Sequence, residues 1–399
     1  MNSIFQKLAV SFALIGGTTL AYAGSPLIPT PAFGDDAGIR VLVNASVSYN
    51  DNIYLDDADE DADTIVTISP GLEFSTGENG RDSFTFRFVE NITYYMDETD
   101  NDRALENFDL HYKHGAEGDK LLLAVSAGFH HNQTVSSRNT ATRGTMNRIF
   151  NYYANAIASY KLGEKTSLRG GFKWKGQTYD NNRWYYNDRQ TYAIPLYLYY
   201  AVTEKLNVGI TGEWRYVDLE SSGYDRSRGV TPGKQQVWFV GLAVEGHAWE
   251  KLTLKGRIGY TSSDYSGRTK DSNDGDNTMG VTLTADYKAT EKLTTSLILN
   301  RDIELDGTGE GVTTTAATIR ANYIIDDYWS ANASIGYTND DYEKSTREDD
   351  IWRFSVGVAY AINEYASAYV SYTHAVDNSN RDYYDYTNNI VTIGFSFRY

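Results

Sequence analysis

Apolar and polar residues alternate along most of the chain with a period of two. Residues 252–260 are typical: apolar side chains, from Leu252 to Tyr260, occupy most even-numbered positions, and Lys255 and Arg257 lie between them. Successive side chains of a β-strand point to opposite faces, so the pattern predicts strands with one apolar and one polar face. It recurs at 206–216, 279–287, 329–337, 352–360 and 391–399. No stretch of comparable length in the sequence has the 3.6-residue apolar period of a helix.

Two kinds of connection separate these predicted strands. Tight-turn sequences that begin with a tyrosine and contain an acidic residue lie at 160–165, 200–205, 287–292, 323–328 and 360–365, with a looser example at 247–251. Their acidic residues follow one another at intervals of about 36 to 46 residues, the length of one hairpin pair. Longer acidic segments lie between them, roughly at 97–104, 131–146, 179–188, 218–234, 262–277, 305–314, 339–350 and 376–387. Short turns that alternate with long loops are typical of an outer-membrane barrel.

The predicted fold is all-β: a transmembrane, antiparallel, up-and-down β-barrel of about 18 strands that begins near Gly38 and ends at Tyr399. An even strand count puts both ends in the periplasm, with short periplasmic turns and longer acidic extracellular loops. A β-propeller is the repetitive alternative, with about 40 residues per blade. A propeller would not need apolar residues bracketed by tyrosines on nearly every strand, so we favour the barrel.

Both ends of the chain suit a secreted barrel. Residues 1–23 are typical of a signal peptide, because Lys7 precedes an apolar stretch and an Ala-Tyr-Ala sequence ends at Ala23. We expect residues 24–36 to be a periplasmic lead-in and residues 37–399 to be the barrel. The last strand ends in Phe395, Phe397 and Tyr399, which we interpret as the C-terminal signal read by the barrel assembly machinery. For this feature alone, a soluble sandwich that ends in a strand is the alternative.

Composition adds further constraints. The mean hydropathy is -0.49 although 14% of the residues are aromatic, and the 33 tyrosines suit a membrane–water interface. Low hydropathy is expected of a barrel, since only alternate residues face lipid. The absence of cysteine from the sequence excludes disulfides and thiolate metal sites. The formal charge of -17 argues against nucleic acid as a partner.

If the apolar faces point outward, the opposite faces line the lumen and carry more basic than acidic residues. The candidates for a basic, selective wall are Arg169, Lys173, Lys175, Arg215, Lys255, Arg257, Arg320 and Arg353, and Arg87 and Lys113 are further inward cations. The inward acidic candidates are Glu213, Glu245 and Asp286, together with Asp109 and Asp302. Like charges on a low-dielectric wall bias which solutes pass, so we expect a pore that favours anionic or acidic saccharide solutes. Alternatively, Glu213 and Glu245 pair with these cations, which then have no selective role.

Four tyrosines also fall on the predicted inward faces: Tyr153, Tyr197, Tyr199 and Tyr369. Such rings can form a stacking track for sugars. They can equally belong to the aromatic girdle at the membrane boundary. The sequence leaves both interpretations open.

Metal binding and catalysis have little support. Residues 56–63 are rich in carboxylates, and 271–276 resemble a calcium loop, but the twelfth position is Thr282 where glutamate is needed. We expect solvated loops, bridged to lipopolysaccharide by divalent ions, with no cofactor and no metal site. His130 and His131 precede Ser136 and Ser137, and His374 precedes Asp377, but nearness in sequence does not make a catalytic triad. We expect no enzyme.

The opening strands carry a family resemblance. Residues 47–54, Val-Ser-Tyr-Asn-Asp-Asn-Ile-Tyr, precede an acidic loop and a strand at 65–74 that contains Ser-Pro-Gly. This opening resembles the family called Putative beta-barrel porin, whose first strand ends in a Tyr-x-x-Asn-Ile-aromatic run and whose second strand carries Ser-Pro-Gly. The resemblance implies an outer-membrane protein of a Gram-negative bacterium, of a kind often encoded beside exopolysaccharide synthesis and export genes. It implies no catalytic residues.

We therefore expect an outer-membrane channel, or porin, for passive diffusion of hydrophilic solutes, linked by the resemblance to exopolysaccharide export. Its expected partners are outer-membrane lipid and lipopolysaccharide, the barrel assembly machinery, and polysaccharide or small hydrophilic solutes. A structural or adhesive barrel, with a plugged lumen and functional acidic surface loops, is the alternative from another class. Sustained conductance distinguishes the two.

Overall fold

The computed structural model describes residues 27–399 except 35, 59, 78–79, 117, 136–143, 181–187, 221–232, 267–274, 307–309 and 344. The predicted signal peptide, residues 1–23, and the first residues of the predicted lead-in therefore lie outside the described residues. The same holds for Ser136, Ser137 and most of the calcium-like segment 271–276.

Strands make up nearly all of the described chain. They are β1 Ile28–Pro29, β2 Gly38–Asn50, β3 Asp63–Thr76, β4 Asp82–Tyr95, β5 Arg103–His114, β6 Leu121–Thr134, β7 Asn147–Lys161, β8 Thr166–Tyr179, β9 Arg189–Ala201, β10 Leu206–Leu219, β11 Lys234–Trp249, β12 Leu252–Ser266, β13 Gly275–Lys288, β14 Leu293–Leu305, β15 Gly311–Ile324, β16 Trp329–Tyr342, β17 Glu348–Ala361, β18 Ala366–Ser379 and β19 Tyr386–Arg398. Single turns of 3-10 helix lie at Pro31–Phe33, Thr99–Asn101 and Asp382–Tyr384. The described part of the chain holds no helix with the length and apolarity to cross a membrane.

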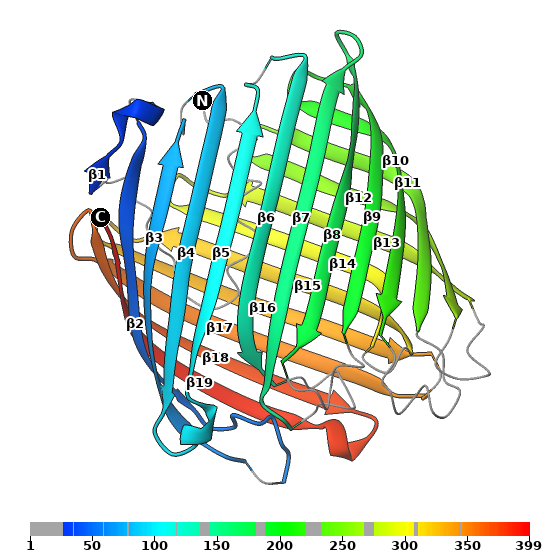
Figure 1. Cartoon of the computed structure of the whole chain (residues 1–399). Coiled ribbons are helices and arrows are strands. Elements are labelled where there is room, and N and C mark those ends of the chain that lie inside the picture. The colour runs from blue at the N-terminus through cyan, green and yellow to red at the C-terminus, as the bar shows by residue number, and fades with distance from the viewer. Residues whose placement is uncertain are drawn as a thin grey trace.

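Strands β2 to β19 form one closed barrel, seen in Figure 1 as a continuous wall. Each strand pairs antiparallel with the next along the chain, and β19 pairs with β2 from Arg398 opposite Leu42 to Ile390 opposite Asn50. The described residues thus form 18 barrel strands, which confirms the predicted fold class. The two-residue β1 adds to one end of β2 outside this count.

The connections divide the barrel into two ends. Short turns at 162–165, 202–205, 250–251, 289–292, 325–328 and 362–365 lie at one end, which we call the turn end. The connections at the opposite end, called the loop end, include the long segments 51–62, 135–146 and 220–233. This alternation is the one that the sequence predicts.

The outer face of the barrel is apolar at alternate positions of each strand. Ile210 of β10 and Val240 of β11 expose 59% and 64% of their surfaces. The same band continues through Leu168, Phe172, Leu196, Leu198, Trp238, Leu242, Ile258 and Tyr260 on neighbouring strands. A contiguous apolar surface of this kind is rare on a soluble monomer, and a barrel places it against lipid.

Two residues that break the alternation fit without a change of register. Pro195 is buried in β9, and the β8–β9 pairing has the same register on both sides of it. Proline has no N–H to donate, so one stretch of the ladder is missing although no bulge forms. Glu90 of β4 lies on the face that also carries Phe88, opposite Glu106 of β5.

Candidate functional site: a basic wall inside the barrel

Ion pairs between strands that are not neighbours identify the inner face of the barrel. Arg169 of β8 pairs with Glu245 of β11. Arg257 of β12 places its Nη2 3.0 Å from Oε1 of Glu213 on β10. Because one or two strands lie between the partners, their side chains can meet only on the concave side of the sheet. These residues of β8 and β10–β12 therefore face the lumen.

Arg215 of β10 reaches farther around the lumen, to β14. Its Nη1 lies 2.6 Å from Oδ2 of Asp302, and its Nη2 lies 3.2 Å from Oδ1 of the same carboxylate. Nη2 also donates to the carbonyl oxygen of Ile303 at 2.7 Å. The planar guanidinium matches a carboxylate at two points, so this contact neutralises the charge of Arg215 and fixes its orientation.

Aromatic rings support two of the paired arginines. The guanidinium carbon of Arg169 lies 5.2 Å from the centre of the Tyr199 ring, and that of Arg257 lies 4.4 Å from the Phe239 ring. Such cation–π contacts favour a fixed guanidinium. Tyr197 stacks on Tyr199 with ring planes 4° apart. Tyr199 is buried, so its ring is closed to a solute, whereas Tyr197 is half-buried.

The lysines of this region carry the charge that is left over. Lys173, Lys175 and Lys255 make no ion pair with any described residue, and Lys175 and Lys255 are exposed within the barrel. Six of the cations predicted from the sequence lie on the wall of β8–β12: these three lysines with Arg169, Arg215 and Arg257. Its carboxylate partners are three, Glu213, Glu245 and Asp302, so three positive charges remain uncompensated. We call this region the basic wall.

Small residues bring the members of the basic wall into rows. Ala193 of β9 lies opposite Lys173 on one side and opposite Arg215 on the other. Lys255 of β12 lies opposite Glu245 of β11. A short side chain between two long ones lets both extend over it, so charges from three strands share one surface.

Arg320 and Arg353 are not part of the basic wall. They lie on β15 and β17, exposed, and neither makes an ion pair with a described residue. The third residue away from the wall is Asp286 of β13, whose carboxylate accepts a hydrogen bond from the Ser296 hydroxyl at 2.6 Å. The structure thus brings together six of the eight predicted basic residues and two of the three predicted acidic ones.

A second polar group lies on β5–β7, beside the basic wall. Asp109 Oδ1 accepts from the Tyr153 hydroxyl at 2.7 Å and lies 2.9 Å from Nε2 of His130. A Cβ at Gly128 would lie 2.4 Å from the Tyr153 ring, so a glycine is needed for this contact. Tyr153 lies opposite Lys175 of β8, which makes the group continuous with the wall.

Two further histidines that the sequence singled out, His374 and His131, contact other residues in the described part of the chain. His374 Nδ1 lies 2.8 Å from Oδ1 of Asn389, a residue of β19, and not against Asp377. His131 stacks on Phe150 with ring centres 4.0 Å apart. Within the described ranges, no three or more His, Cys, Asp and Glu side chains are arranged to hold a metal ion.

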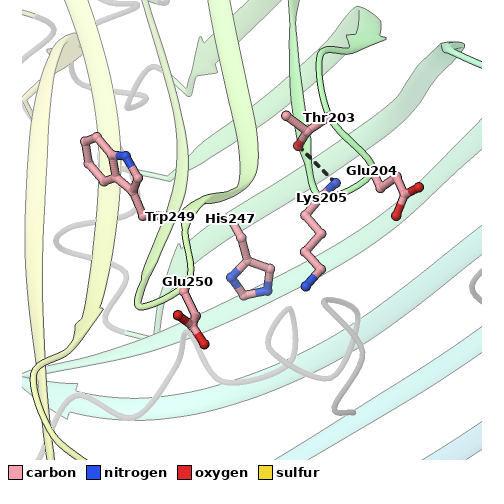
Figure 2. A pocket seen from close by; sticks show the side chains of 6 residues that line it. All are labelled: Thr203, Glu204, Lys205, His247, Trp249 and Glu250. Atoms are coloured by element: carbon pink, nitrogen blue, oxygen red, sulfur yellow. Dashed lines mark hydrogen bonds between the residues drawn. The ribbon is translucent and has the colours of Figure 1, made fainter.

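The turn end of the same strands holds a small cavity of about 580 Å³. Its lining comes from the β9–β10 turn, the end of β11 and the β11–β12 turn, and the residues are Thr203, Glu204, Lys205, His247, Trp249 and Glu250. Figure 2 shows Lys205 and His247 side by side, with Trp249 turned away from them. His247 Nδ1 lies 3.0 Å from the Thr253 hydroxyl of β12. The cavity lies at the turn end of strands that carry the basic wall.

Sequence reasoning missed the residues that fill the loop end of the lumen. Ile303 and Leu305 of β14 are buried against Val217 and Leu219 of β10 and Tyr265 of β12. One sequence feature could have indicated them. Arg301 is a charged residue on the same strand face as the lipid-facing Leu297, which suggests that this face leaves the lipid near residue 301.

A protein-family model matches the C-terminal part of the chain. Residues 289–399 match the model of the family Putative beta-barrel porin 2. The match spans the part of the chain from the β13–β14 turn to the last residue, and it is this part that is similar to the family. No curated protein sequence matches the chain.

Solved structures with a similar fold are distant in sequence. The FrpB iron transporter of Neisseria meningitidis (F3-3 variant) is 11% identical with a TM-score of 0.46, and the match covers 87% of this chain and 63% of that chain. OccK2 (OpdF) of Pseudomonas aeruginosa is 10% identical with a TM-score of 0.48, covering 92% and 98% of the two chains. A bacterial polysaccharide outer membrane secretin is 10% identical with a TM-score of 0.40, covering 90% and 98%.

Proposed function

We propose that the protein is a passive outer-membrane channel for hydrophilic solutes and that its basic wall favours anions, including acidic saccharides. The observation that carries this proposal is the excess of cationic side chains on β8–β12, where Lys173, Lys175 and Lys255 have no carboxylate partner among the described residues. The family resemblance adds the proposal that the solutes include exopolysaccharide or its fragments.

The physical basis is the field inside a narrow, water-filled space. Strand walls and the surrounding lipid have a low dielectric constant, so uncompensated charges on the wall act on passing ions more strongly than they would in bulk water. Lysine ammonium groups stay hydrated and mobile, which allows a solute to bind briefly and leave again. Diffusion of this kind needs no cofactor and no catalytic residue, so we propose no enzymatic activity.

The two ends of the chain add further parts to the proposal. Residues 1–23 would direct secretion, 24–36 would lie in the periplasm, and 37–399 would form the barrel. Phe395, Phe397 and Tyr399 would be read by the barrel assembly machinery. The loop end would contact lipopolysaccharide. Backbone hydrogen bonds between Tyr399 and Val41, at 2.7 and 3.0 Å, support a structural role for the last residue at the closing seam.

The test is ion selectivity of the refolded protein in a planar bilayer. Under a KCl gradient, we expect steady conductance with a reversal potential of the sign that indicates anion preference, and partial block by an acidic oligosaccharide. The triple variant K173Q/K175Q/K255Q should lose that preference. The control K161Q/K165Q/K288Q removes three exposed lysines at the turn end, outside the wall, and should keep it. Cation preference in the natural protein would refute the role of the wall.

A structural or adhesive barrel is the second candidate, and one observation favours it. The apolar side chains of Ile303 and Leu305 are buried inside the loop end, where an open channel would hold water. A barrel that stays silent in bilayers, in all variants, would support this candidate over a channel.

A further inference from the structure

The last residues of β14 leave the barrel wall. Pairing between β13 and β14 stops where Val281 faces Arg301. Pairing of β13 with its other neighbour, β12, continues to Gly275 at the strand's beginning. On its far side β14 stays paired with β15 as far as Leu305. The wall therefore splits between β13 and β14 at the loop end, and residues 302–305 are held by β15 alone.

The detached end of β14 packs against the inner wall at β10, four strands away. Ile303 and Leu305 are 0% and 5% exposed, and they contact Val217 and Leu219 of β10. Three strands, β11 to β13, lie between β14 and β10 in the wall. A contact between them therefore lies inside the lumen. Burial of these apolar side chains favours the inward position over one in water.

Arginines take the place of the missing neighbour strand. The carbonyl oxygen of Ile303 accepts from Arg215 at 2.7 Å, and that of Leu305 accepts from Arg189 of β9 at 3.1 Å. Asp302 binds the same Arg215 through both carboxylate oxygens. The backbone of the detached segment thus keeps hydrogen-bond partners inside the barrel, as buried polar groups require.

We propose that the segment 302–305 is the size-limiting constriction of the channel and that Arg215 is the positioning residue that holds it inside the lumen. This inference rests on the proposed channel function. Along β10, Arg215, Val217 and Leu219 follow one another toward the loop end, so the constriction lies beyond Glu213 and its partner Arg257 on that side. A solute entering from the loop end meets the constriction before it reaches most of the basic wall.

Two variants separate the anchor from the apolar contact. R215A removes the three hydrogen bonds to Asp302 and Ile303, and I303S/L305S removes the apolar packing. We expect both to conduct more than the natural protein and to admit larger neutral polyethylene glycols, measured by the loss of conductance on polymer entry. The matched control R257A removes an arginine paired to Glu213 that does not touch β14; it should change ion preference and leave the polymer cut-off in place. Strand content by circular dichroism shows which variants have folded.

The outcomes also distinguish the inference from the proposed function. If the natural protein conducts and both folded variants keep its polymer cut-off, the constriction is elsewhere and the inference fails while the channel stands. If the natural protein is silent and R215A conducts, the segment seals the lumen, which supports the inference and refutes an open channel. Silence of every variant refutes both.

Discussion

At the scale of single residues, the arginines and the lysines of the basic wall have different partners. Arg169, Arg215 and Arg257 each bind a carboxylate, whereas Lys173 and Lys255 bind none among the described residues. The guanidinium is weakly hydrated and forks onto a carboxylate, so it suits a fixed position. The ammonium group is strongly hydrated and stays available to a passing ion. The net positive charge of the wall should therefore come from the lysines, whereas each arginine neutralises a carboxylate and fixes the shape of the wall.

Asp188, just before β9 at the loop end, gives a prediction about pH. Its carboxylate accepts from the Tyr179 backbone N–H at 2.7 Å, but burial raises the pKa of Asp188 from its ordinary value of 3.8 to about 6. The folded protein then holds this proton more tightly than the unfolded chain, so the free energy of unfolding falls as the pH rises through that range. We expect D188N to raise it by roughly 1 kcal/mol at pH 7.5, reduced from the full shift because the side chain is half exposed, and not at pH 4. Urea unfolding in lipid vesicles measures the free energy of unfolding at both pH values.

Asp326 in the β15–β16 turn provides a control of opposite sign. Backbone N–H groups of Tyr328 and Trp329 hold the pKa of Asp326 below its ordinary value. The stability that this carboxylate contributes is present above the ordinary pKa and is lost as the pH falls. D326N should therefore lower the free energy of unfolding at pH 7.5. A loss of stability at pH 7.5 in D188N as well would contradict the assignment for Asp188.

At the scale of elements, four turns at the turn end share one pattern of side-chain to backbone hydrogen bonds. The residue before the acidic position caps the turn: Thr203, Thr290, Asp326 and Asn363 each accept from backbone N–H groups two or three residues later. Side-chain acceptors of this kind replace a backbone partner in tight turns. The repeated sequence therefore reflects turn geometry.

Variants at two neighbouring residues of the β13–β14 turn test whether these hydrogen bonds stabilise the turn. Thr290 Oγ1 accepts from the N–H groups of Lys292 and Leu293 at 3.2 and 2.9 Å. T290A should lower the free energy of unfolding by about 0.5–1 kcal/mol, the net value of such hydrogen bonds near water. The neighbouring variant E291A should have no measurable effect, and T290S should restore stability. Equal losses in T290A and E291A, measured by urea unfolding at constant m-value, would count against the capping role.

The alternation of residues predicts which face a side chain takes but not where its strand runs. Leu297 and Ile303 are in phase on β14, and the first is 37% exposed to the outside whereas the second is fully buried. Strand number, turns and the inward arginines follow from a local period of two. The inward path of residues 302–305 depends on contacts with β9 and β10, more than 80 residues earlier in the chain, which no local pattern records. The sequence allowed Glu213 and Glu245 to pair with these cations, but which arginine binds which carboxylate depends on contacts between strands that are not neighbours.

At the scale of the whole molecule, the charge of the chain and the charge of the basic wall have opposite signs. The sequence carries a formal charge of -17, and acidic residues are frequent in the loop-end connections such as 51–62. The basic wall carries three uncompensated positive charges inside the barrel. Charges on loops face bulk water, where their field is weak, whereas those on the wall act in a confined space with low-dielectric sides. The wall should therefore dominate ion preference despite the total charge.

This distribution predicts how selectivity depends on salt. The screening length is about 10 Å at 0.1 M and about 3 Å at 1 M ionic strength, so wall charges reach across a lumen only in dilute salt. Reversal potentials measured at the same concentration ratio should show anion preference near 0.1 M that declines toward 1 M. In K173Q/K175Q/K255Q the acidic loops remain, and a weak cation preference should appear in dilute salt only. An anion preference that is unchanged between the two salt ranges would mean that a bound anion or the constriction at 302–305, and not the field of the basic wall, sets selectivity.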